Sequence, residues 1–200
     1  MSMILGLVTL GDTNISRVLA DPPLVWKVIA PDDPEIYAQA RGGPAKPGFL
    51  SRMFRRSATQ SGAELELSRE EGIGTDLDKS WHGIHFLLNG EAWEGHPPLD
   101  FLVASGRQVG DIDVGYGPAR VFTAAETKAI YEWLEAITED DLRARFSPTD
   151  MMKKGIYPEI WDRDPKDDDT LGYLIEFYRI LRGFLHQAVD CGVGVVVYLS

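Results

Sequence analysis

Cysteine is almost absent from the chain: Cys191 is the only one in 200 residues. A single cysteine excludes an intrachain disulfide, and disulfide-stabilised domains belong to oxidising compartments. The sequence therefore does not have the composition of a small secreted, disulfide-rich domain. A reducing, cytoplasmic location is the simplest expectation.

Long apolar runs are also missing. No stretch approaches the roughly 18 consecutive apolar residues that a membrane-spanning helix requires. The first eight residues lack the basic region of a secretory signal and are too short for one. We therefore expect no membrane span. An apolar content of 44% over 200 residues is enough for a single domain with a packed core.

Positive charge is scarce. The chain holds 20 Lys and Arg against 31 Asp and Glu, a net charge of −11. Binding to nucleic acid requires a basic surface, so this balance argues against nucleic acid as the main partner. An acidic surface keeps many proteins soluble, and it also suits docking to a basic partner protein.

One segment departs from this acidity. Residues 41–63 contain five basic residues and no acidic one, interleaved with Phe49, Leu50, Met53 and Phe54. Prolines and glycines around it argue against continuous regular structure. We interpret residues 41–63 as a basic, mobile insertion that folds back on the acidic surface. A short amphipathic helix that binds an acidic partner is the alternative.

The order of apolar and turn-forming residues predicts a single compact α+β domain over residues 1–200. An apolar run over residues 3–10 and a β-branched run over residues 193–199 predict strands that can pair with each other. Thr123 and Glu126 form a capping box for a helix reaching Ala136, with Ile130, Trp133, Leu134 and Ile137 facing inward. Thr138 starts a second helix, and residues 171–190 form the longest one. We expect several helices packed on a small sheet.

Residues 75–90 are the most unusual stretch. Thr75 or Asp76 can cap a helix that ends at Asn89-Gly90. An apolar stripe recurs at helical spacing, formed by Leu77, Trp81, Ile84 and Leu88. A polar stripe with the same spacing is formed by Asp78, His82, His85 and Asn89. The pattern predicts one core face and one face that carries two imidazoles and a carboxylate.

Two interpretations of the polar stripe remain open. The first is a functional site, with Asp78, His82 and His85 as metal ligands or as a general acid and base. The second is structural, with Asp78 holding His82 in a hydrogen bond and His85 satisfied at the edge of the core. His-x-x-His is a weak metal motif by itself. No metal and no cofactor are therefore assigned.

The sequence Gly115-Tyr-Gly-Pro-Ala-Arg120 predicts a rigid bend that presents Tyr116 and Arg120. Arg120 can hold a carboxylate or phosphate with two hydrogen bonds. The alternative is an internal salt bridge to Asp111, Asp113 or Asp78. The glycine spacing does not match a phosphate-binding loop.

Three motifs together resemble one known family. They are Leu77–Gly90 (LDKSWHGIHFLLNG), Gly115–Arg120 (GYGPAR) and Ile156–Trp161 (IYPEIW). In order and wording they are similar to the YfbM-like family of bacterial proteins, a domain of unknown function of the DUF1877 type. The resemblance implies a compact soluble α+β domain and brings no assigned activity. It also implies that the three motifs meet in space.

Two functions fit these observations. The first is a non-enzymatic binding protein with a protein partner, such as an immunity-type protein that neutralises a toxin. The second is a small-molecule-binding domain or hydrolase-like enzyme with a cleft lined by Asp78, Trp81, His82, His85, Tyr116 and Arg120. No nucleophile is evident for the second, since Cys191 precedes a glycine at a helix end.

Overall fold

The computed structural model describes residues 2–42 and 65–200. Apart from Arg41 and Gly42, the basic segment 41–63 lies outside the described residues. Arg41 itself forms an ion pair with Asp21.

One five-stranded antiparallel sheet forms the centre of the molecule, in the order β2-β1-β5-β4-β3. The strands are β1 (Leu5–Leu10), β2 (Gly74–Asp76), β3 (Arg107–Asp113), β4 (Pro118–Phe122) and β5 (Gly194–Leu199). β1 and β5 pair from Leu5 opposite Leu199 to Leu10 opposite Gly194. The predicted pairing of the N- and C-terminal strands is confirmed.

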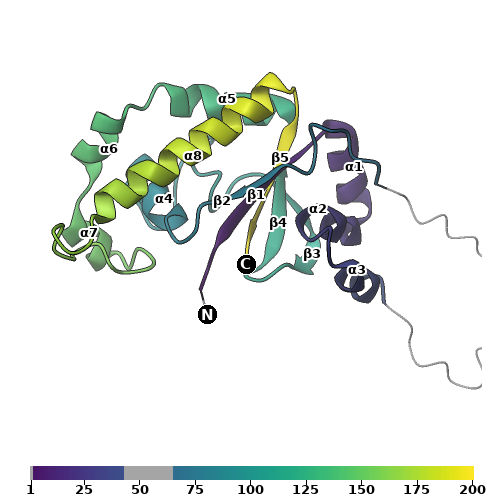
Figure 1. Cartoon of the computed structure of the whole chain (residues 1–200), viewed down its shortest axis with the longest axis horizontal. Helices are drawn as coiled ribbons and strands as arrows, with labels where there is room; N and C mark the ends of the chain where they lie inside the picture. The colour runs from purple at the N-terminus through teal and green to yellow at the C-terminus, as the bar shows by residue number, and fades with distance from the viewer. Residues whose placement is uncertain (1, 43–64) are drawn as a thin grey trace, which may run out of the picture.

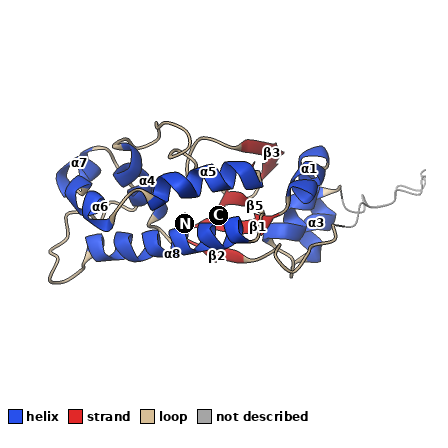
Figure 2. Cartoon of the chain, turned by 90° about the horizontal axis from the view of Figure 1, so that it is seen from above, coloured by secondary structure: helices blue, strands red, loops and turns tan. Residues whose placement is uncertain are grey.

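Helices cover both faces of this sheet (Figures 1 and 2). On one side lie α1 (Asp12–Ala20), the 3₁₀ helix η1 (Pro22–Val25), α2 (Trp26–Ile29) and α3 (Pro34–Ala40). On the other lie α4 (Trp81–Asn89), α5 (Ala124–Glu135), α6 (Glu139–Arg145), α7 (Pro148–Lys153) and α8 (Thr170–Asp190). The α+β class predicted from the sequence is confirmed.

The two central strands, β1 and β5, are mostly apolar because both of their faces are largely buried. Side chains alternate between the faces of a strand. Leu7 and Val197 accordingly pack with the cluster beneath α4, α5 and α8, whereas Val8 and Val196 pack with α1, η1 and α2. Burial of an apolar side chain on this scale contributes about 1.5–3 kcal/mol, so the two central strands hold the two helical layers together.

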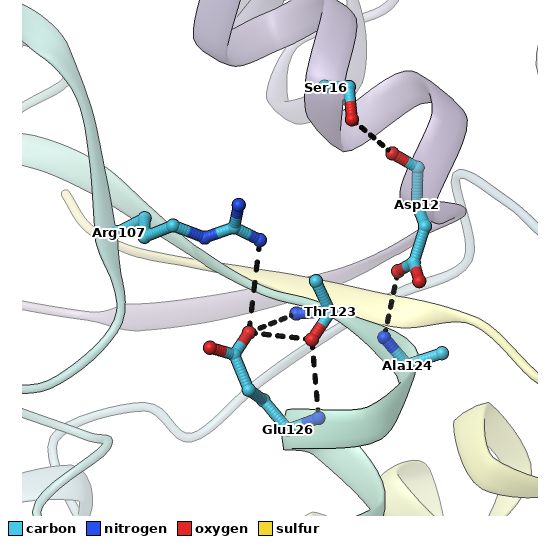
Figure 3. A network of polar contacts seen from close by, with 6 residues as sticks. All are labelled: Asp12, Ser16, Arg107, Thr123, Ala124 and Glu126. Atoms are coloured by element: carbon cyan, nitrogen blue, oxygen red, sulfur yellow. Dashed lines mark hydrogen bonds and ion pairs between the residues drawn. The ribbon is translucent and has the colours of Figure 1, made fainter.

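A polar junction joins the two layers at one end of the sheet (Figure 3). The carboxylate of Asp12, at the start of α1, accepts a hydrogen bond of 2.8 Å from the backbone N–H of Ala124, at the start of α5. Thr123 and Glu126 form the predicted capping box. Arg107 lies 3.8 Å from the Glu126 carboxylate. The junction satisfies backbone donors that the first turn of a helix leaves open.

Helices α5 and α8 lie side by side across the sheet (Figures 1 and 2), close to their predicted limits. The prediction that Trp133 faces inward is wrong: its side chain is 56% exposed, whereas Ile130 and Leu134 are buried. Trp133 lies at the margin of the buried stripe, where no described element covers it. No helix in the described residues combines the length and apolar character needed to cross a membrane.

The stretch 75–90 is not one helix. Gly74–Asp76 is β2, which pairs with β1 through Thr75 opposite Leu7. The backbone then turns at Asp78, whose φ is 44°, and α4 begins only at Trp81. The hydrogen bonds of β1 therefore override the local helical pattern of residues 75–80.

Candidate functional site

Asp78 does not join the histidines. It lies in the turn before α4, and its carboxylate accepts a hydrogen bond of 2.9 Å from the hydroxyl of Tyr173 on α8. The prediction that Asp78, His82 and His85 share one face of a helix is therefore wrong for Asp78. The carboxylate fastens the start of α4 to α8 and does not orient either imidazole.

His82 is fully buried and both of its ring nitrogens are occupied. Nδ1 accepts a hydrogen bond of 3.0 Å from the backbone N–H of Tyr157. Nε2 lies 2.7 Å from the carbonyl oxygen of Ala92, which can only accept. The ring must therefore be neutral, with its proton on Nε2. His82 fixes two loops that are 65 residues apart in the sequence.

His85 repeats this arrangement one turn later. Its Nε2 lies 3.2 Å from the carbonyl oxygen of Glu94, and its Nδ1 lies 3.2 Å from the side-chain amide nitrogen of Asn89. The same amide donates to the carbonyl of Leu99 at 2.9 Å. His85 and Asn89 therefore attach the loop after α4 to the helix.

Burial keeps both imidazoles neutral. The low-polarity surroundings disfavour the charged form and lower the pKa of His82 below its ordinary value. The same effect lowers the pKa of His85 to about 4. A general base is most effective when its pKa lies near the working pH, so His85 is poorly suited to acid–base chemistry at neutral pH.

Two aromatic rings pack against His82. Trp81 stacks on it at 4.8 Å between ring centroids, with 11° between the planes. Trp93 covers it from the loop at 4.5 Å while remaining 57% exposed. The aromatic cover explains how a ring next to the surface is kept from water.

Arg120 lies on β4 and binds backbone, not a carboxylate. Its Nη1 donates to the carbonyls of Phe101, at 2.8 Å, and Ser105. Its Nη2 donates to the carbonyl of Leu102 at 2.7 Å. Arg120 therefore does not form the expected salt bridge to Asp111, Asp113 or Asp78. Burial of the guanidinium lowers the pKa of Arg120 to about 10. The guanidinium orders the turns at residues 101–105.

Arg120→Lys is expected to lower the free energy of unfolding by about 1–2 kcal/mol, because one ammonium cannot reproduce the planar fork that reaches three carbonyls. Urea denaturation followed by tryptophan fluorescence measures this change. Arg163→Lys, at an exposed pair with Asp168, is the control and should change stability by less than about 0.5 kcal/mol. Equal effects of the two substitutions would contradict the assigned role of Arg120.

Three of the predicted site residues meet in one small cavity. Trp81, Tyr116 and Arg120 line a hollow of about 130 Å³, together with Trp93 and side chains of β5. Tyr116 stands at its rim, 43% exposed. His82, His85 and Asp78 do not line the hollow, so the six candidates divide into a cavity group and a structural group.

In the described parts of the chain, no cluster of three His, Cys, Asp or Glu side chains could hold a metal ion. Two partners that complete the histidine contacts, Trp93 and the backbone of Tyr157, were not predicted from the sequence. Trp93 stood in a loop rich in turn formers, and a backbone N–H carries no sequence signature. The only hint of these contacts was the expectation that the motifs at residues 77–90 and 156–161 lie close together.

The comparisons with known proteins show the family and the fold of the chain. The family model described as "Domain of unknown function (DUF1877)" matches residues 1–198. The chain belongs to this family. A solved structure, YfbM from Escherichia coli, described as a protein of unknown function, superposes with a TM-score of 0.63 at 15% identity, covering 98% of this chain and 99% of that chain. The comparison with curated proteins gives no match.

The three motifs that carried the family resemblance meet in the structure. The backbone N–H of Tyr157 donates to His82, so the third motif is bound to the first. The Trp161 ring packs on Gly83, where an added Cβ would lie 2.8 Å from a ring carbon. Trp81 and Arg120 share a cavity. The motifs are thus accounted for by packing and hydrogen bonding.

Proposed function

We propose that the protein is a non-catalytic binding protein that recognises a basic partner protein through the outer face of α5. The observation that carries this proposal is Trp133, which is 56% exposed in the last turn of α5. Tryptophan is among the residues most enriched at the energetic centres of protein interfaces.

The surroundings of Trp133 are apolar and hollowed. Ala129 and Ala136, one turn before and one turn after it, are also exposed. A groove of about 540 Å³ begins at Trp133 and Ile137 and continues along the C-terminal half of α4. A second hollow of about 330 Å³ is lined by the same tryptophan together with Ala129, Glu132 and Ala136. We call Ala129, Trp133, Ala136 and the two hollows the Trp133 face.

Charge around the Trp133 face favours a basic partner. Residues 132–141 contain five carboxylates and no Lys or Arg, and Glu132, Glu135 and Asp140 are exposed. They outnumber the two basic residues at this face, Lys128, which pairs with Glu132, and Arg145, which lines the groove. An apolar centre within a charged rim is the usual anatomy of a protein interface. Complementary charge at the rim raises the association rate and selects the partner. A basic toxin bound by an immunity-type protein would have this chemistry.

The test places a photo-crosslinking phenylalanine derivative at position 133 and, as the control, at Ile180, an exposed apolar residue on α8. We expect irradiation in cells to give one adduct from position 133, with a protein of net positive charge, and none from position 180. Trp133→Ala should weaken binding of that purified partner at least about 30-fold, the effect of a residue worth about 2 kcal/mol.

Two results would count against this proposal. The first is the same adducts from positions 133 and 180, which would show nonspecific contact. The second is unchanged affinity of the Trp133→Ala protein, provided that its thermal unfolding matches that of the wild type.

A second candidate function is the binding of a small molecule in the cavity lined by Trp81, Tyr116 and Arg120. Its volume of about 130 Å³ is below the roughly 300 Å³ of common ligand sites, so a small carboxylate is the largest occupant it suits. Saturable shifts of the Trp81 and Trp93 indole signals on titration with acetate would support this function, and their absence would exclude that ligand.

A further inference from the structure

The loop after α4, residues 91–98, is attached to the fold mainly by side chains. None of its residues is buried, and within the described parts of the chain no backbone hydrogen bond joins it to a helix or strand. Three side chains of α4 hold this region instead: His82, His85 and Asn89, which bond to the carbonyl oxygens of Ala92, Glu94 and Leu99. Segments with few buried contacts and a solvent-exposed backbone open at the lowest free energy. We call residues 91–98 the strap.

We propose that the strap is released from α4, with the rest of the fold intact, when His82 and His85 each take up a second proton. The strap would then be an acid-sensitive cover over the hollow lined by Trp81, Tyr116 and Arg120. The inference does not depend on the Trp133 face.

The hydrogen bonds of His82 are compatible only with a neutral ring. Its Nδ1 lies 3.0 Å from the backbone nitrogen of Tyr157 and accepts that N–H. A protonated imidazole carries a hydrogen on both nitrogens, so two donors would point at each other across this distance. The backbone at Tyr157 is held in place, because the Trp161 indole donates to the neighbouring carbonyl of Ile156 at 2.6 Å. The ring therefore has to move, and the strap lies on its other side.

The charges around His85 oppose a second proton in the same way. The side chains that act on it electrostatically are His82, Asp100 and Arg120. With both rings neutral, the charges of Arg120 and Asp100 offset each other. Two protonated rings would add two positive charges that no described side chain offsets. A buried charge without a partner is unfavourable, and moving the strap lets water reach the rings.

The surroundings of His82 add no compensating charge. Its ring contacts Trp81, Trp93 and the backbone of Tyr157, and no charged side chain of the described residues acts on it. Burial lowers the pKa of His82 and brings the pKa of His85 to about 4. Release of the strap is therefore expected at acidic pH, and the strap stays closed at neutral pH.

Trp93 connects the strap to the hollow. It covers His82 with 4.5 Å between ring centroids, and it also forms part of the wall of the hollow of about 130 Å³ that Trp81, Tyr116 and Arg120 line. Moving the strap away removes this wall. Protonation of two rings that do not line the hollow would thus open it to solvent.

The test is fluorine-19 NMR of the full-length protein, with its five tryptophans replaced by fluorotryptophan, between pH 7 and pH 4. Trp93→Phe assigns the signal of the strap, and Trp161, which is 1% exposed, reports the core. We expect the Trp93 signal to move to the position of free fluorotryptophan at a higher pH than the Trp161 signal. A single step shared by both signals, or an unmoved Trp93 signal once His85 is protonated, would overturn the proposal.

Variants change the attachment of the strap in two ways. Asn89→Ala removes the bond to Leu99 and should move release to a higher pH. His85→Gln removes one of the two proton-binding rings, so release should depend on pH about half as steeply. Identical release curves in the wild type and both variants would contradict the assigned attachment.

The matched control is Lys154→Gln. It breaks a surface ion pair with Glu91, at the start of the strap, and such pairs contribute little to stability. The pH of release should stay within about 0.3 unit of the wild-type value. In every variant, a native Trp161 signal at pH 7 shows that the protein is folded. A shift in Lys154→Gln as large as that in Asn89→Ala would contradict the role of α4 in holding the strap.

Discussion

Replacing His82 with leucine is expected to lower the free energy of unfolding by about 2–4 kcal/mol. Leucine fills much of the space but leaves the N–H of Tyr157 and the carbonyl of Ala92 without partners. An unpaired group in a buried position costs about 1–3 kcal/mol. Trp93 also loses the ring on which it packs. Urea denaturation at pH 7, followed by tryptophan fluorescence, measures the loss.

The matched control is His186→Leu. His186 is an exposed histidine on α8 whose side chain contacts Asp190 and the edge of the Tyr131 ring at the surface, so its replacement should change stability by less than about 0.5 kcal/mol. A loss below about 1 kcal/mol for His82→Leu would mean that the two loops are held by other contacts, and the structural role assigned to the ring would be incorrect.

Stability should fall as the pH drops from about 6.5 to about 4. Burial lowers the pKa of His85 to about 4 and also lowers that of His82, whereas a histidine in the unfolded chain titrates near 6.5. Below that pH the unfolded state binds more protons than the folded state, so protonation favours unfolding. The free energy of unfolding then decreases by up to about 1.4 kcal/mol per pH unit for each histidine. Between pH 6.5 and pH 4, the total loss from His85 is on the order of 3 kcal/mol.

Urea denaturation at intervals between pH 7 and pH 5 tests this dependence before most carboxylates titrate. His85→Gln should have a smaller slope than the wild type, because one of the two lowered pKa values has been removed. A wild-type stability that is flat across this range, or a full slope in His85→Gln, would contradict the assignment of two buried neutral imidazoles.

The helix starts and strands that are determined by neighbouring residues could be predicted from the sequence. The capping box of Thr123 and Glu126 gave the start of α5, since both hydrogen bonds lie within one helical turn. The apolar runs at the two ends gave β1 and β5, because strands buried on both faces admit few polar residues. The resemblance to the family added that the three motifs meet.

The features that were mispredicted depend on distant residues. Asp78 leaves the helix because β2 pairs with β1, about 70 residues earlier in the chain. Arg120 was expected to pair with a carboxylate, but the carbonyls it binds are in a turn about 15–19 residues before it. Trp133 has the helical spacing of an inward residue and is exposed because the fold places no described element over it. Helical periodicity alone could not supply these contacts.

Because the candidate residues separate into a cavity group and a structural group, the histidines are no longer the first place to look for function. His82 and His85 are used by the backbone of two loops, so the stretch that looked most like a reaction centre is accounted for by folding. Folding does not account for an exposed tryptophan on α5 beside an apolar groove, or for a buried Arg182 Nε–H on α8 that has no partner among the described residues.

The protonation state of the histidine rings tests most directly whether His82 and His85 are structural residues. Nitrogen-15 NMR of the imidazole side chains between pH 7.5 and pH 5 reports both the protonated nitrogen and the pKa of each ring. We expect both His82 and His85 to be neutral with the proton on Nε2, His85 to remain unprotonated at pH 5.5, and the pKa of His82 to lie below its ordinary value. Titration of His82 or His85 near pH 6.5, or a proton on Nδ1 of either ring, would contradict this expectation.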